Sequence, residues 1–115
     1  MTVRRGDVVR IDWPYSDRTG SKLRPALVVQ TDALNGLIAD TILVLISRTQ
    51  RALGATEVLL DPAGEPRCGF RYSSVVSCNN LLTVDQGLIP QTIGTVSAAA
   101  IQQVEARLRF TLGLP

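Results

Sequence analysis

One arginine stands where a charged, flexible segment meets an apolar one. Arg24 precedes Pro25 and the run Ala-Leu-Val-Val-Gln at 26–30. Proline fixes its own backbone angle, so the guanidinium beside it is held in one place while the preceding segment moves. Arginine's planar fork matches a phosphate group, so this position suits a phosphate clamp. The alternative is a surface arginine that bonds a loop carbonyl.

A hydroxyl and further cations follow the most apolar stretch of the chain. Ser47 ends that stretch and precedes Arg48 and Arg51. These groups emerge where a buried strand reaches solvent, and they either contact a ligand or merely cap the strand end. Asn79 and Asn80 pose the same choice further along, because paired amides either read base edges and polarise a phosphate or make a turn.

The composition removes several other chemistries. The chain has no histidine and only two cysteines, Cys68 and Cys78, which is too few ligands for the usual zinc sites. We expect no metal and no other cofactor. The absence of histidine also removes the usual group for proton transfer near neutral pH. The net charge is only +2, and every basic residue except Lys22 is arginine, which reflects either phosphate recognition or a GC-rich genome.

Length and hydropathy indicate one compact domain over residues 1–115. Of the 115 residues, 45% are hydrophobic, which suits a single core. No apolar run approaches the roughly 20 residues that cross a bilayer. The basic start of the chain leads into an alternating pattern with no apolar signal core behind it. We therefore expect a soluble, cytoplasmic protein with both cysteines reduced.

Short strands at close intervals dominate the pattern. Alternation over 7–13 places Val9, Ile11 and Trp13 on one face of a strand. The β-branched run 41–46 predicts a central strand that is buried on both faces. Charges and turn formers without periodicity predict a long exposed loop over 14–22. The remaining predicted segments are strands at 26–30, 56–60 and 70–77, a connection at 32–40 and a turn at 61–66.

Only the C-terminal segment has helical spacing. Ser97 is suited to cap its first turn, and Gly113 stands where a helix would end. One apolar face recurs at helical intervals and consists of Ile101, Val104, Leu108 and Leu112. The sequence therefore predicts a mainly β fold, a small barrel or sandwich, against which one amphipathic helix packs.

Taken in order, these features resemble the MazF/PemK toxin family, which includes Kid. The resemblance covers nearly the whole chain, and the combination of R-G-D-V with a following G-x-x-x-R-P-x-L-V is fairly specific. The segments that carry it are Arg5–Val8, Gly20–Val28, Ile46-Ser47, Ser77–Leu81 with Thr83–Asp85, and Ile93-Gly94 before the terminal helix.

The resemblance implies an SH3-like β-barrel of the CcdB/PemK type with a C-terminal helix, which forms a homodimer and is opposed by a MazE/PemI-like antitoxin. It also implies a sequence-specific endoribonuclease of the mRNA interferase type. In that chemistry the ribose 2′-hydroxyl attacks the adjacent phosphorus and leaves a 2′,3′-cyclic phosphate and a 5′-hydroxyl, without a metal. The arginine of the R-P motif corresponds to Arg24, and the hydroxyl after the central strand, usually threonine in the family, corresponds to Ser47. These two are the candidate catalytic residues.

We expect the segment 14–22 to close over single-stranded RNA. Bases, which are unstacked in single strands, would be read by amides and by stacking on Trp13 or Tyr15, although Trp13 is first a core residue. The candidates for RNA contact are the cations, the hydroxyl and the amides near the catalytic pair, namely Arg18, Ser21, Lys22, Arg48, Asn79 and Asn80.

One departure from the family leaves the general base open. Some relatives place an arginine and an aspartate around the cysteine, where this chain has Ser77 and Asn79. Asparagine cannot accept a proton as a base. Either Arg24, Ser47 and the environment of the 2′-hydroxyl suffice, or a carboxylate serves, with Asp12, Asp17 and Asp85 as candidates.

Two other functions fit the same features. CcdB toxins share the barrel but inhibit DNA gyrase without catalysis, and their action would depend on the terminal helix. A decayed toxin that acts only as a protein-binding barrel is the third possibility, for which Ser77 and Asn79 are the best argument.

Overall fold

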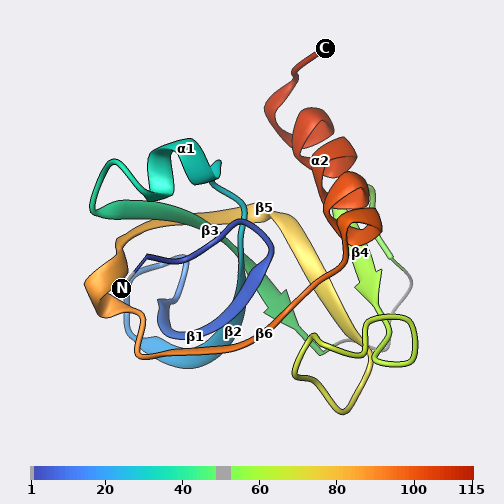
Figure 1. Cartoon of the computed structure of the whole chain (residues 1–115), viewed down its shortest axis with the longest axis horizontal. Helices are drawn as coiled ribbons and strands as arrows, with labels where there is room; N and C mark the ends of the chain where they lie inside the picture. Colours follow the sequence, from blue (N-terminus) through green and yellow to red (C-terminus); the bar gives the residue numbers. More distant parts are fainter. Residues whose placement is uncertain (1, 49–52) are drawn as a thin grey trace.

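The computed structural model describes residues 2–48 and 53–115, so that Arg51, expected beside Ser47, lies outside the described residues. Six strands form one antiparallel sheet in the order β4-β5-β3-β2-β1-β6 (Figure 1). The elements in chain order are β1 (Asp7–Pro14), β2 (Ser21–Val28), α1 (Asp32–Asn35), β3 (Asp40–Ser47), β4 (Glu57–Leu60), β5 (Ser74–Asp85), the 3-10 helix η1 (Gln86–Leu88), β6 (Gln91–Thr95) and α2 (Ala98–Leu112).

The sheet curls on itself but does not close. The mainly β fold with a C-terminal helix is confirmed, yet β4 and β6 stay at the two edges and do not pair in the part of the chain that the structure describes. The segment between β4 and β5 lies along β6 instead, where the Thr95 amide donates to the Arg67 carbonyl at 2.8 Å. A loop thus fills the gap that a strand pair would close in a complete barrel.

Two glycines let this loop and β6 touch through their backbones. Gly69 has a φ of +84°, and a Cβ added to it would collide with the Ile93 carbonyl. A Cβ on Gly94 would collide with the carbonyl groups of Arg67 and Cys68. Only glycine allows such a close approach of two main chains.

Apolar side chains are buried on both faces of the sheet. Val9, Ile11 and Trp13 share one core with Leu43, which confirms the face predicted for β1. Val44 lies in the other core, together with Val104 of α2. Because neighbouring residues of β3 enter different cores, β3 is the central strand buried on both faces that its composition predicts.

Helix α2 begins and ends as the sequence predicts, but part of its apolar face is uncovered. The Ser97 hydroxyl accepts the Ala100 amide hydrogen at 3.1 Å, and Gly113 ends the helix in the left-handed region. Leu112, predicted to face the sheet, is 55% exposed. The prediction was wrong because the last turns of α2 extend past the sheet, as Figure 1 shows. Among the described residues, neither α1 nor α2 has the length and apolar character of a membrane-spanning helix.

Glu65 fastens the loop between β4 and β5 to the start of α2. One carboxylate oxygen accepts the Ser97 amide at 2.6 Å and the other accepts the Ser97 hydroxyl at 2.7 Å. A negative charge is favoured at a helix N-terminus. We expect Glu65→Ala to lower the free energy of unfolding by about 1–2 kcal/mol in urea denaturation. Glu65→Gln, which keeps an acceptor, should lose less, and equal stability of all three proteins would contradict this role.

Two predicted boundaries were wrong. The loop predicted over 14–22 is a shorter hairpin turn, because Pro14 pairs with Ser21 and Trp13 pairs with Lys22. The turn is closed by a hydrogen bond from the Tyr15 amide to the Gly20 carbonyl at 2.8 Å. The first half of β2 is largely exposed and has mostly polar side chains, so it lacks the apolar periodicity by which a strand is predicted from sequence. Residues 70–73, predicted as strand, precede β5.

Candidate active site

The site begins where β2 and β3 separate. Their ladder ends at the pair Ala26 and Leu45, next to Pro25, which has no amide hydrogen to extend it. Arg24 therefore pairs only with Ile11 of β1. Ser47 pairs only with Val75 of β5. The two strands diverge here, and the side chains of Arg24 and Ser47 project beside the opening.

A bulge in β5 brings amides to the same place. Leu45 of β3 pairs with Ser77, but its neighbour Val44 pairs with Leu81, so Cys78, Asn79 and Asn80 face no residue of β3. Such an insertion bends the strand and re-aims its side chains. Asn79 accepts a hydrogen bond from the Thr56 hydroxyl at 2.9 Å through its carbonyl oxygen, which leaves its NH2 group directed elsewhere.

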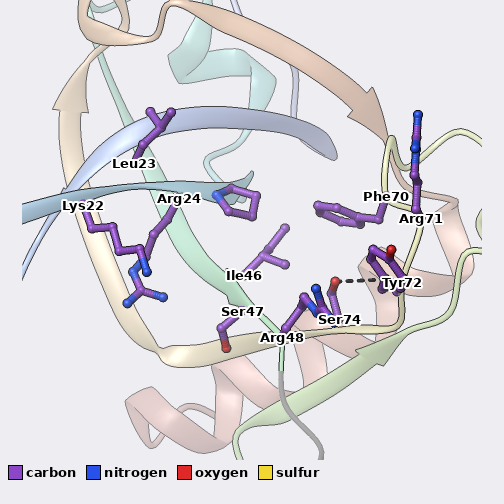
Figure 2. Close-up of a pocket in the computed structure, with 11 residues that line it drawn as sticks. Lys22, Leu23, Arg24, Ile46, Ser47, Arg48, Phe70, Arg71, Tyr72 and Ser74 are labelled. Atoms are coloured by element: carbon purple, nitrogen blue, oxygen red, sulfur yellow. Dashed lines mark hydrogen bonds between the residues drawn. The ribbon is translucent and has the colours of Figure 1, made fainter.

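Two cavities meet at the separated strands. The smaller, with a volume of about 240 Å³, is here termed the β2–β3 cleft, and its lining comprises residues 22–25, 46–48, 70–72 and 74 (Figure 2). The larger, of about 930 Å³, is termed the hairpin groove, and its lining comprises residues 13–16, 18, 24, 45, 47, 77 and 79–82. Arg24 and Ser47 are the only described residues that line both.

Both cavities carry positive charge without compensation. No aspartate or glutamate of the described residues lines either one. The lining cations are Arg18 in the groove, Lys22, Arg48 and Arg71 in the cleft, and Arg24 in both. A concave surface lined by one sign of charge concentrates ligands of the opposite sign, so these cavities suit an anionic ligand.

The structure brings most of the predicted site residues together. Arg24 and Ser47 share both cavities, and neither side chain has a hydrogen bond or ion pair within residues 2–48 and 53–115. The predicted RNA-contact residues divide between the two cavities. Lys22 and Arg48 line the cleft, and Arg18, Asn79 and Asn80 line the groove. Ser21 lines neither cavity, because its hydroxyl donates to Asp12 at 2.8 Å.

The three carboxylates considered as general bases are engaged elsewhere. Asp12 accepts that bond from Ser21. Asp17 accepts both the amide and the hydroxyl of Thr19, and the backbone bond is the larger of the causes that lower its pKa. Asp85 caps η1 by accepting the Gly87 amide at 2.7 Å. None of the three lines the cleft or the groove.

Sequence reasoning missed the far wall of the cleft. Phe70, Arg71 and Tyr72 form it, and the Arg48 guanidinium lies 4.3 Å from the centre of the Tyr72 ring. The alternation of aromatic and basic residues at 70–72 is a signal for such a wall, but the same alternation is also typical of a strand. What the sequence did not show is that this segment, which follows the glycine contact with β6, lines the same cleft as Ser47.

The two aromatic residues proposed for base stacking differ in burial. Trp13 is 8% exposed and belongs to a core, as expected, although it also lines the hairpin groove. Tyr15 is 44% exposed and lines the same groove. Tyr15 is therefore the ring that is accessible for stacking.

Cys78, in the β5 bulge, is a buried free thiol, as is Cys68. Burial raises the pKa of the Cys78 thiol from 9.0 to about 11, against a smaller opposing effect of Arg107. Because the pKa of this thiol is higher in the folded state than in the unfolded state, the thiol contributes stability that is fully present below its unfolded-state pKa. This contribution is lost as the pH rises through its folded-state pKa. We expect the free energy of unfolding to fall between about pH 9 and pH 11.

That pH dependence is measured by urea denaturation at a series of pH values. Cys78→Ala, which has no thiol at this position, should lose less stability over the same interval. Parallel curves for the two proteins would show that the Cys78 thiol does not titrate as described.

Comparison with known proteins places the chain among toxins. A family model described as PemK-like, MazF-like toxin of type II toxin-antitoxin system matches residues 4–112. Endoribonuclease MazF4 of Mycobacterium tuberculosis is 31% identical over 111 residues, which are 96% of this chain and 93% of that protein. Endoribonuclease EndoA of Bacillus subtilis is 30% identical over 118 residues, covering 99% of this chain and 97% of the relative.

The fold agrees with solved structures of the same group. An endoribonuclease in complex with its cognate antitoxin, from a mycobacterial species, superposes with a TM-score of 0.80 at 27% identity and covers 98% of this chain and 97% of its own. MazF from Deinococcus radiodurans has the same fold, with a TM-score of 0.75 at 23% identity, and it covers 99% of each chain. The family match over nearly the full length, the near-complete relatives and the shared fold agree, and the chain belongs to the PemK-like, MazF-like toxins of type II toxin–antitoxin systems.

Proposed function

We propose that this toxin is an endoribonuclease that cuts single-stranded RNA with the scissile phosphate held between Arg24 and Ser47. The observation that carries the proposal is that these two side chains line both cavities and have no protein partner among the described residues. A strand that passes from the hairpin groove into the β2–β3 cleft must cross this point. The relatives named endoribonucleases support the reaction class.

The proposed reaction needs only the chain, the RNA and solvent water. The ribose 2′-hydroxyl attacks the adjacent phosphorus, the bond from phosphorus to the 5′-oxygen breaks, and a 2′,3′-cyclic phosphate and a 5′-hydroxyl result. Arg24 stabilises the additional negative charge that the phosphoryl oxygens carry in the transition state, and Ser47 donates a hydrogen bond to one of them. Solvent takes the proton of the 2′-hydroxyl and returns one to the 5′-oxygen, since no carboxylate of the described residues lines the site.

The remaining cations and amides position the strand. Arg18 in the groove and Lys22 and Arg48 in the cleft are placed to contact phosphates on either side of the scissile one. The amides of Asn79 and Asn80 face the groove, where they are suited to hydrogen-bond base edges. Removal of one flanking cation should weaken RNA binding for all sequences alike, because phosphates carry no sequence information.

We further propose that the toxin acts in the cytoplasm as a homodimer that a cognate antitoxin neutralises. A mycobacterial relative was solved with its cognate antitoxin, and two free thiols are typical of a reducing compartment. The hairpin groove is lined by Arg18 and Arg24 and by no carboxylate of the described residues. It therefore suits an acidic, initially disordered segment of such an antitoxin, which would compete with RNA for the same surface.

The test is to incubate the purified toxin with a long, unstructured RNA in the presence of EDTA and to map the cuts. The expected result is a set of discrete cuts with cyclic phosphate ends, which disappear when the antitoxin is added. Inhibition of DNA gyrase in place of RNA cleavage would favour the CcdB-like alternative. RNA or antitoxin binding without turnover would indicate a decayed toxin.

A further inference from the structure

The β2–β3 cleft contains aromatic and apolar side chains that phosphate chemistry does not use. Phe70 and Tyr72 lie on one side of it, Lys22 and Arg24 on the other, and Ile46 between them (Figure 2). A surface meant only for a phosphodiester would be polar throughout. The apolar half of the cleft therefore needs a ligand group with a flat, apolar face.

We propose that this cleft is a specificity subsite that takes one keto nucleobase, guanine or uracil, from the nucleotide next to the scissile phosphate, with Tyr72 as a specificity-determining residue. The inference rests on the proposed function, because it assumes that RNA crosses Arg24 and Ser47. The volume of about 240 Å³ is below the roughly 300–1,000 Å³ of pockets for drug-sized ligands. It suits a single base.

The polar groups of the cleft favour bases with carbonyl oxygens. Its charged side chains, those of Lys22, Arg24, Arg48 and Arg71, donate hydrogen bonds and accept none. Guanine presents the acceptors O6 and N7, and uracil presents the acceptor O4, whereas adenine and cytosine present an exocyclic amino group at the corresponding position. An amino group would meet these cationic donors and no carboxylate of the described residues, so adenine and cytosine are disfavoured.

The wall that carries Tyr72 is preformed. The Tyr72 ring lies against the Arg48 guanidinium, at 4.3 Å from the ring centre. The main-chain carbonyl of Tyr72 accepts a hydrogen bond from the Ser74 hydroxyl at 3.2 Å. Upstream, the loop is held to β6 by the contact at Gly69 and to α2 by Glu65. Preorganisation of this kind reduces the entropy lost when the ligand binds.

Binding of 2′-fluoro hexanucleotides tests the subsite, because without a 2′-hydroxyl they cannot be cut. Fluorescence anisotropy should show that the wild type binds the uridine hexamer more tightly than the cytidine hexamer. Tyr72→Ala should bind the uridine hexamer roughly 5- to 100-fold more weakly and lose the preference for uridine. Tyr72→Phe keeps the ring and should retain both the affinity and the preference. Tyr72 is 60% exposed, so the substitution leaves the cores untouched.

Leu88→Ala is the matched control, since Leu88 is 67% exposed and lines neither cavity. It should bind both hexamers as the wild type does. Unchanged uridine binding by Tyr72→Ala, or equal binding of the two hexamers by the wild type, would overturn the subsite. Failure of the wild type to cut RNA in the separate cleavage assay would instead sink the proposed function and leave the binding result readable.

Discussion

Replacing Arg24 with alanine is expected to slow RNA cleavage by roughly 10²- to 10³-fold, which corresponds to about 3–4 kcal/mol of transition-state stabilisation. The guanidinium has no partner among the described residues, so its full hydrogen-bonding capacity is available to the phosphate. For the same reason the free energy of unfolding should change little. Single-turnover cleavage of a labelled RNA measures the first quantity, and urea denaturation measures the second.

The neighbouring strand offers a matched control for this variant. Arg10 of β1 lies opposite Pro25, is exposed and lines neither cavity, so Arg10→Ala should cut RNA at the wild-type rate. Arg24→Lys keeps the charge but loses the planar fork and should fall between wild type and Arg24→Ala. A folded Arg24→Ala protein with an undiminished rate would reject the assignment.

Ser47 provides an internal check on the same site. Ser47→Ala removes one neutral hydrogen-bond donor and should cost about 1 kcal/mol, or roughly fivefold in rate. If Arg24 and Ser47 hold the same phosphate, the double variant should be less impaired than the sum of the two single losses. Strict additivity would place the two side chains on separate parts of the RNA.

Replacing Gly94 with alanine is expected to lower the free energy of unfolding by about 3–4 kcal/mol, at the upper end of the cost of overpacking. The added methyl group would meet the main-chain carbonyl groups of Arg67 and Cys68, which cannot rotate away as a side chain can. Either β6 or the loop must move, and the loop carries one wall of the β2–β3 cleft. Urea denaturation at one fixed protein concentration is the measurement, because the proposed dimerisation would make stability depend on concentration.

Gly36→Ala is the control for that change. Gly36 has a negative φ, and a Cβ there would meet only the Asp32 carbonyl at 3.7 Å, which is ordinary contact. We expect Gly36→Ala to be as stable as the wild type or slightly more so. If Gly94→Ala behaves in the same way, the loop does not lie against β6 as described.

The sequence motifs proved to serve different purposes. Arg5 and Asp7 of the opening R-G-D-V motif are structural, since Arg5 pairs with Glu105 of α2 at 2.9 Å and Asp7 accepts the Arg4 amide. Arg24 of the R-P motif and Ser47 after the central strand instead have no partner in residues 2–48 and 53–115, and both line the two cavities. Motif order identified the family, but only hydrogen-bond partners separate the residues that hold the fold from those left available to a ligand.

The sequence by itself determined the elements whose signals are local. Alternation fixed the faces of β1, a β-branched run fixed β3 as central, and Ser97 and Gly113 fixed the ends of α2. These signals depend on residues close in the chain, such as a cap and the amide three positions later, so they can be read from a linear pattern.

Tertiary structure decided everything that depends on pairing between distant segments. The hairpin register turned half of a supposed loop into β2, and the bulge in β5 turned Asn79 and Asn80 to the groove. The loop that touches β6 at Gly94 also carries Tyr72, which lines the same cleft as Ser47. Register and close backbone approach arise from contacts far apart in sequence, and no local spacing encodes them. The arginine and the hydroxyl were therefore visible in the chain, whereas the two cavities they share were not.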